Sequence, residues 1–349
     1  MNQSKSPVMV GPAGGPVSGQ MIAFIEACKA FDNPVVVDAY FSSWSKVVWY
    51  WIALIRAFLV SAGPVYITTS RSFAGYWVRD FPVFVMAKFF RRKIINHLHG
   101  NDFRPFRDGC GPFTAFSIDV CYSWIAVSCV PARTLAWHYE RYSFPVEVVP
   151  NFYEDGLGLL KCPKNYSGEC EVLYFSNFIP SKGFSVVYSA CKQLVSEGHK
   201  LRLTMCGGVL DLEDSQENIN KQLDVMRRDS WVTISEPVFG SKKLEAFERA
   251  HVLILPTKYP TEASPICLIE ALAAGCYVIS TDQGAISELV GDAHGAITTP
   301  DSEAVAEALK VFICLEGKAE VERANRQYAF ERYSSSSYRR KITGVISGT

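Results

Sequence analysis

Two glutamates, Glu262 and Glu270, flank a predicted helix start and carry the strongest chemical signal in the chain. The first N–H groups of that helix, those of Ile266 and Cys267, have no partner inside the helix and lie at the positive end of its dipole, so they form a ready site for a phosphate. Carboxylates cannot hold an anion, but they accept hydrogen bonds from hydroxyl groups. A phosphate between two sets of hydroxyls describes a nucleotide sugar. A charged helix N-terminus beside a solvated glutamate would show the same spacing.

The elements around these glutamates follow from local signals. An apolar strand at 251–255 leads into a loop. Ser264 is a good N-cap, and Pro265 suits the first helical position. The helix is expected over 266–274, with Gly275 as its C-terminal stop.

Lys182 lies in a second loop, which follows the apolar strand 172–175. The loop leads into a helix that starts near Gly183, so it could aim the lysine ammonium at a phosphate. A solvated loop lysine is the alternative interpretation.

A glycine-rich loop runs from Gly11 to Gly19, between the first predicted strand and a helix from about Gln20. Such a loop lets the backbone approach a ligand closely. The loop lacks the Gly-x-Gly-x-x-Gly spacing, and an ordinary terminal segment could have the same composition.

His97 and His99 alternate along the strand 94–98, so their side chains point the same way. His99 ends the strand and meets the expected cleft. Two such histidines could bind a metal ion, but no acidic or cysteine partner stands nearby, and we predict no metal site. A structural histidine, hydrogen-bonded at the strand end, is the other interpretation.

Composition indicates a folded chain of about two domains. It has 349 residues, of which 48% are hydrophobic and 20% charged. Thirty-five basic and 35 acidic residues cancel, which argues against nucleic acid as a partner. Residues 1–150 carry a net charge of +5 and six of the seven tryptophans, whereas residues 151–349 carry −5. The two halves are therefore expected to face different partners.

Short apolar runs alternate with helical patterns in both halves. Runs that are apolar on both faces predict a parallel sheet covered by helices on both sides. This series occurs twice, so the expected fold class is α/β, with two Rossmann-like, doubly wound domains facing across a cleft. Ligands should lie beyond the carboxyl ends of the strands. The predicted strands are 8–10, 35–37, 65–68, 94–98, 125–128, 146–149, 172–175, 201–205, 232–234, 251–255, 277–280 and 296–298.

Domain boundaries follow from the polar, Gly/Pro/Asn-rich stretch between the two series. We expect a first domain over residues 1–152, a linker over 153–170 and a second domain over 171–325. The last segment, 326–349, is expected to be helical and to cross back to the first domain.

The segment Glu262-Ala-Ser-Pro-Ile-Cys-Leu-Ile-Glu270 closely resembles the Glu-x7-Glu signature of the family 4 glycosyltransferases, which have the GT-B fold. Its flanks, 255–260 and 278–284, are similar as well. The likeness is dense over about residues 146–335 and sparse before them. It implies that residues 1–152 bind the acceptor and that residues 171–325 bind the nucleotide sugar. It implies that Glu262 lies near the donor sugar hydroxyls and that Glu270 binds the ribose hydroxyls. The other donor contacts expected at this helix start are Ser264, Pro265, Ile266 and Cys267.

The resemblance also gives a role to the Lys182 loop. Lys182, followed by Gly183, matches the lysine of a basic pair that binds the donor diphosphate in the family. Asn177 falls where the family often has the arginine of that pair. Asparagine carries no charge, so one diphosphate contact is weakened or moved.

Two motifs of the first half gain roles in the same way. The family has a histidine at the donor sugar, which His99 matches, and a glycine-rich loop over the donor phosphate and the acceptor, for which Gly15 and Gly19 are the candidates. His99, Lys182 and Glu262 are therefore the expected catalytic set.

The resemblance implies a retaining transfer of a sugar from a nucleotide donor to a hydroxyl acceptor, by front-face attack and without a dedicated nucleophile. It implies no cofactor and no essential metal, since a lysine and helix N-termini neutralise the leaving diphosphate. The expected acceptor is a glycan or lipid-linked oligosaccharide, as in surface polysaccharide or lipopolysaccharide assembly. The alternatives are another GT-B enzyme, such as an epimerase or a phosphorylase, and a non-catalytic sugar-nucleotide-binding module.

Eleven cysteines occur without any Cys-x-x-Cys pair, and we interpret them as free thiols of a cytoplasmic protein. The longest apolar runs, 47–60 and 81–90, are shorter than the roughly 18–20 residues of a membrane-spanning helix. The chain is therefore expected to lie at most on a membrane.

Aromatic and basic residues favour such a peripheral contact in the first half. One helical stretch gathers Trp44, Trp49, Tyr50 and Trp51, and the apolar run 81–90 ends in three basic residues, 91–93. This pairing suits an anionic membrane surface. An ordinary core helix with a basic end would show the same pattern.

Overall fold

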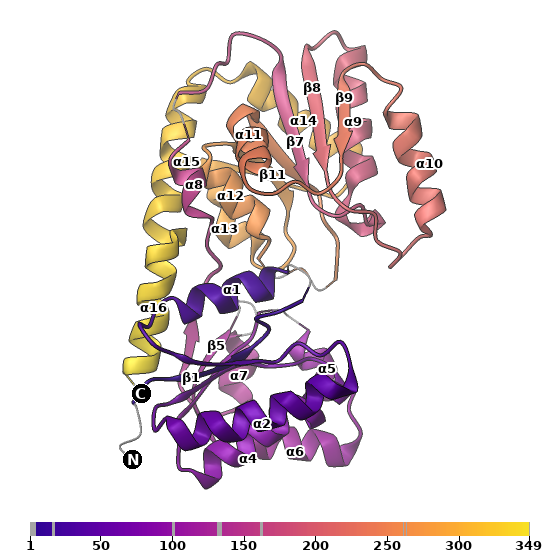
Figure 1. The fold of residues 1–349 in the computed structure, drawn as a ribbon. Helices are drawn as coiled ribbons and strands as arrows, with labels where there is room; N and C mark the ends of the chain where they lie inside the picture. Colours follow the sequence, from indigo (N-terminus) through magenta and orange to yellow (C-terminus); the bar gives the residue numbers. More distant parts are fainter. Residues whose placement is uncertain are drawn as a thin grey trace. The chain divides into compact units, whose positions relative to one another are not determined.

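The computed structural model describes residues 5–15, 18–99, 102–130, 135–160, 163–260, 262 and 264–348 (Figure 1). The chain forms two compact units. Unit 1 comprises Met1–Asn151 together with Ser335–Thr349, and unit 2 comprises Phe152–Ser334. Each unit is built around its own sheet.

Unit 1 contains a parallel six-stranded sheet in the order β2-β1-β3-β4-β5-β6. Its strands are β1 (Val8–Gly11), β2 (Val35–Asp38), β3 (Val65–Thr68), β4 (Ile94–His97), β5 (Ile125–Val130) and β6 (Val146–Val148). Its helices are α1 (Gly19–Cys28), α2 (Trp44–Val60), α3 (Phe73–Gly75), the π-helical turn η1 (Tyr76–Asp80), α4 (Phe81–Phe89), α5 (Phe103–Asp108), α6 (Pro112–Tyr122), α7 (Leu135–Arg141) and α16 (Ser335–Ser347).

Unit 2 contains a second parallel six-stranded sheet, in the order β12-β11-β10-β7-β8-β9. Its strands are β7 (Cys170–Phe175), β8 (Leu201–Cys206), β9 (Val232–Ser235), β10 (Val252–Leu255), β11 (Tyr277–Thr281) and β12 (Gly295–Thr298). Its helices are α8 (Asp155–Gly158), the 3₁₀ turn η3 (Pro180–Lys182), α9 (Phe184–Ser196), α10 (Gln216–Met226), α11 (Ser241–Arg249), α12 (Ile266–Ala273), α13 (Ile286–His294), α14 (Ser302–Cys314) and α15 (Lys318–Tyr333).

All twelve predicted strands occur, which confirms the α/β class with two doubly wound sheets. The central strands β1, β3 and β10 are buried at every position. In unit 2, α9 packs on α14, whereas α12 packs on α15, α13 and α8. Because helices cover the sheet, side chains on both of its faces must be apolar, and the strands therefore appear in the sequence as continuous apolar runs.

The chain segments that follow the two boundaries between the units are folded and belong to the cores of the units. Residues 153–170, expected as a linker, include α8, and they bury Tyr153 and Leu157 in the core of unit 2. The terminal helix α16 packs on α1, where the Tyr338 hydroxyl donates to the Ala23 carbonyl at 3.0 Å. The C-terminal helix thereby completes unit 1.

The ten described cysteines are free. None of the helices in the described part of the chain has the length and hydropathy needed to cross a membrane.

Candidate active site

The candidate site of unit 2 lies at the carboxyl ends of two paired strands. β7 and β10 are parallel neighbours. The loop after β7 leads through η3 to Lys182, and the loop after β10 leads to Glu262. Because parallel strands end at the same edge of a sheet, the fold brings these two loops together.

Lys182 and Glu262 form an ion pair in which both side chains are mostly buried, with 15% and 10% of their area exposed. The Lys182 ammonium also lies 4.8 Å from the centroid of the Tyr259 ring, over its face. The sequence predicted the lysine and the glutamate as separate contacts to a donor, and the structure shows them in direct contact. Tyr259 was not predicted, although it stands in a segment that resembles the family.

Backbone contacts fix the two loops against each other. The Lys258 N–H donates to the Ser181 carbonyl at 2.7 Å. Gly183 has a φ of +79°, and a Cβ there would lie 2.6 Å from the Pro256 carbonyl oxygen. Only glycine fits this contact and this left-handed backbone. Gly183 therefore sets the position from which Lys182 projects.

Helix α12 begins at Ile266, as expected, but its N-cap differs from the prediction. Its N-cap is Pro265, with an extended backbone (φ −62°, ψ 122°), and no side chain caps it. The prediction of Ser264 as N-cap is therefore wrong, because Pro265 is itself still outside the helix. Ile266 and Cys267 are the first helical residues, as expected, and their N–H groups are among those that an α-helix leaves unpaired internally. Burial raises the pKa of the Cys267 thiol to about 12, so the thiol is not a nucleophile at neutral pH.

Glu270 is buried on α12, and its carboxylate lies 2.5 Å from the ammonium of Lys243 on α11. The same ammonium lies 3.3 Å from Glu154. Burial raises the pKa of Glu270, and the positive charge of Lys243 opposes that rise. Although burial alone would lower the pKa of Lys243, the charges of Glu270 and Glu154 raise it. The second glutamate of the signature is thus held by a lysine that no sequence signal singled out.

Asn177 connects two loops of unit 2. Its side-chain oxygen accepts a hydrogen bond from the Gly208 N–H at 3.3 Å, and its carbonyl accepts one from the Tyr174 hydroxyl at 3.0 Å. The side-chain contact joins the loop after β7 to the loop after β8. An arginine at this position would keep the backbone contact but could not accept the Gly208 hydrogen bond, because its side chain has no acceptor.

The glycine-rich loop of unit 1 is anchored by Asp38 at the end of β2. One Asp38 oxygen accepts from the N–H groups of Ala13 at 2.8 Å and Gly14 at 3.1 Å. Gly15 has a φ of +96°, and a Cβ there would lie 2.7 Å from the Tyr40 ring. Two loop amides are therefore committed to a carboxylate of the protein, a connection that the sequence did not indicate.

Gly19, the second glycine candidate in this loop, is the first residue of α1. The Ser18 hydroxyl caps that helix by accepting from the Met21 N–H at 3.2 Å. Residues 16–17 of the predicted loop lie outside the described residues.

His99 lies two residues beyond β4, which ends at His97. The two rings are adjacent, with centroids 4.0 Å apart. His97 is buried, and its Nδ1 lies 2.6 Å from the Tyr66 hydroxyl. Burial and the nearby charge of Arg71 lower the pKa of His99 to about 3, so its imidazole is neutral at pH 7. A neutral imidazole can donate or accept a hydrogen bond but brings no charge to a diphosphate.

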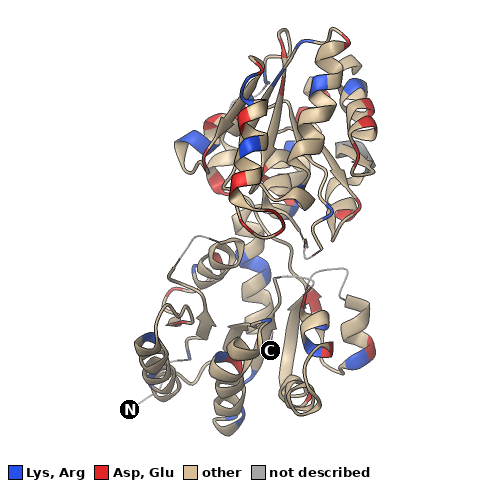
Figure 2. Ribbon diagram, turned by 90° about the vertical axis from the view of Figure 1, so that its right-hand side faces the viewer, with Lys and Arg blue, Asp and Glu red and all other residues tan. Residues whose placement is uncertain are grey.

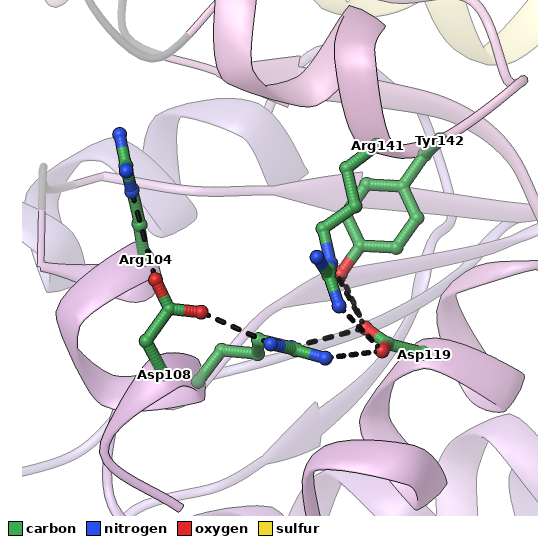
Figure 3. Close-up of polar contacts among 6 residues, drawn as sticks. Arg104, Asp108, Asp119, Arg141 and Tyr142 are labelled. Carbon is green, nitrogen blue, oxygen red and sulfur yellow. Dashed lines mark hydrogen bonds and ion pairs between the residues drawn. The ribbon is translucent and has the colours of Figure 1, made fainter.

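A different polar cluster in unit 1 joins α5, α6 and α7 (Figure 3). Asp119 accepts hydrogen bonds from both guanidinium groups of Arg107 and Arg141, at 2.5 to 3.3 Å, and from the Tyr142 hydroxyl at 2.9 Å. It borders a hollow of about 900 Å³ that also includes Ile125, the first residue of β5. This is the amino end of the strand, opposite the edge where doubly wound sheets bind ligands. We therefore interpret the cluster as structural.

Within the described ranges, no group of three or more His, Cys, Asp or Glu residues is placed to hold a metal ion.

Comparison with known proteins identifies a family model that matches part of the sequence and solved structures that share the fold. Residues 163–332 match the family model of the group 1 glycosyl transferases. No curated protein matches the chain in sequence. A glycosyltransferase from Rickettsia africae ESF-5 has a similar structure, with a TM-score of 0.75 at 15% identity over 99% of this chain and 98% of that one.

Two further solved structures are similar over nearly the whole chain. Anabaena Alr3699/HepE in complex with UDP has a TM-score of 0.74 at 14% identity, over 99% of this chain and 100% of that one. Sucrose-phosphate synthase from Thermosynechococcus elongatus has a TM-score of 0.67 at 15% identity, over 99% of both chains. At these identities the likeness shows a shared fold.

Proposed function

The chain belongs, through residues 163–332, to the group 1 glycosyl transferases, and we propose that it is a retaining enzyme that moves a sugar from a nucleotide-sugar donor to a hydroxyl of a glycan or lipid-linked acceptor. The fold is GT-B, with two Rossmann-like sheets. The observation that supports the proposal best is the pairing of Lys182 with Glu262 beside the N-terminus of α12.

Each group at this edge suits one part of a nucleotide sugar. Lys182 and the first N–H groups of α12 would hold the diphosphate, since both offer positive charge to an anion. Glu262 would accept hydrogen bonds from hydroxyls of the donor sugar. Glu270, held by Lys243 on α11, would accept hydrogen bonds from the ribose. His99, neutral at pH 7, is proposed at the donor sugar.

The chemical step then depends on the leaving diphosphate. As the bond from the sugar to the diphosphate breaks, negative charge grows on the phosphate oxygen, and Lys182 stabilises that charge. The same oxygen, on the front face of the sugar, can accept the proton of the attacking hydroxyl. The acceptor oxygen then forms the new bond on the face that the diphosphate left, so the configuration is retained. No protein nucleophile is needed.

We propose that the reaction needs no metal ion. The chain contains no Asp-x-Asp sequence, the usual carboxylate pair for a divalent ion on a diphosphate. Lys182 and the α12 N-terminus supply positive charge in its place. Activity should survive excess EDTA. Full loss with EDTA, restored by Mg²⁺ or Mn²⁺, would reject this mechanism.

The proposed site of action is the cytoplasmic face of a membrane, where a lipid-linked glycan would be extended during surface polysaccharide assembly. Free cysteines suit a reducing compartment.

The test begins with the donor. Anabaena HepE has been solved with UDP and with UDP-glucose, so UDP-sugars are the first candidates, followed by GDP- and ADP-sugars. A donor at 100 times its dissociation constant should stabilise the chain by about 2.7 kcal/mol in thermal unfolding. Slow hydrolysis of that donor should release a sugar whose anomeric configuration, followed by NMR, is initially that of the donor. Absence of stabilisation by every nucleotide sugar would reject the proposal, and inverted product would reject a retaining mechanism.

A further inference from the structure

Helix α2 has two apolar faces, although a helix on one side of a sheet needs only one. Its inner face buries Tyr50, Leu54 and Phe58 in the core of unit 1. The opposite side is also apolar, yet it is exposed. This second side, called here the outer face of α2, consists of Trp44, Val48, Trp51, Ile52, Ile55 and Leu59.

The outer face forms a continuous stripe. Its residues recur at intervals of three or four, which places them on one line along the helix. Trp44 is 84% exposed, Val48 59% and Leu59 56%. Trp49, beside the stripe, is 68% exposed. Single exposed apolar residues are ordinary, but a contiguous stripe four turns long marks an interaction surface.

The exposed charges on α2 itself have a single sign. Between Asp38 and Asp102 the only acidic residue is Asp80, and it is fully buried. Lys46 and Arg56 on α2 are both exposed. In the unit that carries both labelled termini, Figure 2 shows long tan stretches of ribbon, whereas blue and red are denser on the other unit. The exposed surface of α2 is therefore apolar and basic, and the exposed carboxylate that precedes it in the chain, Asp38, lies at the end of β2.

The end of α4 lies beside α2 and also exposes aromatic and basic residues. α2 packs on α4, and the Phe58 and Phe90 rings lie 5.5 Å apart. Beyond them Phe89 is 80% exposed, and the charged residues Lys88, Arg91 and Lys93 are exposed as well.

The basic residues 91–93, which the sequence suggested for membrane contact, differ in their surroundings in the structure. The Arg92 guanidinium donates to the Ser61 carbonyl at 2.8 Å, so this arginine supports the end of α2. Most of α4 is core, with Pro82, Val83, Phe84 and Ala87 buried. Within α4 and the run that follows it, the exposed aromatic and basic residues therefore lie at the last turn of the helix and just beyond it.

We propose that the outer face of α2 docks on an anionic lipid bilayer, with the helix lying in the plane of the interface. Tryptophans favour the boundary between headgroups and acyl chains, and flanking Lys and Arg side chains reach the anionic headgroups. Docking would place unit 1 at the surface where a lipid-linked acceptor resides, and in that respect the inference rests on the proposed function.

A second copy of the chain fits this face less well. A symmetric dimer through α2 would bring Lys46 and Arg56 of one copy next to the same residues of the other, with no carboxylate on either helix to compensate. An anionic bilayer supplies the missing charge.

The test compares two double variants in vesicle co-sedimentation at low salt. The vesicles are phosphatidylcholine alone, or phosphatidylcholine with 30% phosphatidylglycerol as a chosen composition. V48E/I55E places two carboxylates on the outer face. V225E/V311E places two carboxylates on helices of unit 2, at positions where the valines are 53% and 55% exposed. Because it also adds two glutamates, it changes the net charge by the same amount as V48E/I55E. Wild type and V225E/V311E should bind the anionic vesicles, and V48E/I55E should bind at least about tenfold more weakly.

The charges are tested separately. K46S/R56S should bind about fivefold more weakly for each charge removed, and added salt should weaken wild-type binding. All six substituted positions are exposed, and circular dichroism verifies the fold of each variant. Donor hydrolysis should be unchanged in every variant, which separates a failure of docking from a failure of the donor-site assignment.

Three results would overturn the proposal: no binding of wild type to anionic vesicles at low salt, equal binding of wild type and V48E/I55E, or a wild-type dimer that V48E/I55E dissociates while vesicles remain unbound. The last result would identify the face as an interface between copies.

Discussion

Lys182 and Glu262 stand 80 residues apart in the sequence, yet their side chains form an ion pair at the carboxyl edge of the unit 2 sheet. Each group neutralises the other in this arrangement. In the proposed mechanism a diphosphate at Lys182 would compete with Glu262 for the ammonium, and the released carboxylate would accept hydrogen bonds from sugar hydroxyls. The pair would then connect diphosphate binding to sugar recognition.

Replacing Lys182 tests this relationship. In K182A the charge that stabilises the leaving diphosphate is lost, and we expect turnover to fall about 10²- to 10³-fold, the scale for one electrostatic contact to a transition state. K182R keeps the charge and should retain part of the activity. The measurement is the rate of nucleotide release from the donor.

A matched control for K182A is K192A. The Lys192 ammonium lies 5.3 Å from the centroid of the Tyr188 ring, a geometry similar to that of the Lys182 ammonium, which lies 4.8 Å from the centroid of Tyr259. Lys192, however, belongs to helix α9 and not to the loops of the site. K192A should keep wild-type turnover. If K182A also kept it, Lys182 would have no part in the reaction.

Lys243 should control nucleotide affinity through Glu270. In K243M the buried Glu270 carboxylate loses its 2.5 Å partner, so its position and charge are no longer maintained. A hydrogen bond to a charged group stabilises by about 1.5–3 kcal/mol, so the dissociation constant for the nucleoside diphosphate of the donor should rise about 10- to 100-fold in both K243M and E270A. Isothermal titration with that nucleotide, UDP being the first one to test, measures this without turnover.

The double variant K243M/E270A distinguishes positioning from direct contact. If Lys243 acts through Glu270, the double variant should bind UDP no worse than E270A alone, because the two losses are not additive. K221M, which removes an exposed pair with Glu217, serves as the control and should bind normally. Wild-type affinity in K243M would show that Lys243 has no positioning role.

The fold could be predicted because buried parallel strands leave continuous apolar runs, as in β10, where all of Val252–Leu255 is buried. Glu262, Glu270 and Lys182 could be identified because they match short motifs of a known family, each contained in one continuous segment. Lys243 and Tyr259 could not, since they reach the unit 2 site through tertiary contacts that no spacing encodes, and the same holds for Asp38 at the glycine-rich loop of unit 1.

The error at Ser264 has a local cause. A serine before a proline fits an N-cap that is followed by the first helical residue. Pro265, however, has a ψ of 122°, so it is itself the N-cap, and the first helical residue is Ile266. Both placements satisfy the same sequence preferences, so only the backbone geometry decides between them.

Gly183 should tolerate no side chain. G183A would put a Cβ 2.6 Å from the Pro256 carbonyl oxygen and would force alanine to a φ of +79°. G198A has nearly the same backbone requirement, with a φ of +92°, but nothing lies within 4 Å of its Cβ. G198A should lose about 1–2 kcal/mol of unfolding free energy for the left-handed backbone alone. G183A should lose clearly more, and turnover should fall with it because Lys182 moves. Equal urea midpoints of the two variants would show that the Pro256 contact imposes no constraint.

Asp119 should stabilise unit 1 in a pH-dependent way. Desolvation favours its neutral form, but hydrogen bonds from Arg141, Arg107 and Tyr142 outweigh this and hold the pKa of Asp119 below its ordinary value of 3.8 (Figure 3). Because the folded pKa lies below the unfolded one, this stabilisation is fully present well above pH 3.8 and is lost as the pH falls through the folded pKa.

The urea midpoint of D119N should therefore lie below that of wild type at pH 7, and the gap should narrow steadily at pH values below about 4, where the wild-type carboxylate takes up its proton. D224N is the control, since Asp224 makes an exposed pair with Arg227 within one helix, and exposed pairs stabilise little. Its midpoint should follow that of wild type at every pH. A gap between D119N and wild type that stays constant down to pH 3 would mean that the carboxyl stabilises unit 1 by packing and neutral hydrogen bonds, with no contribution from its charge.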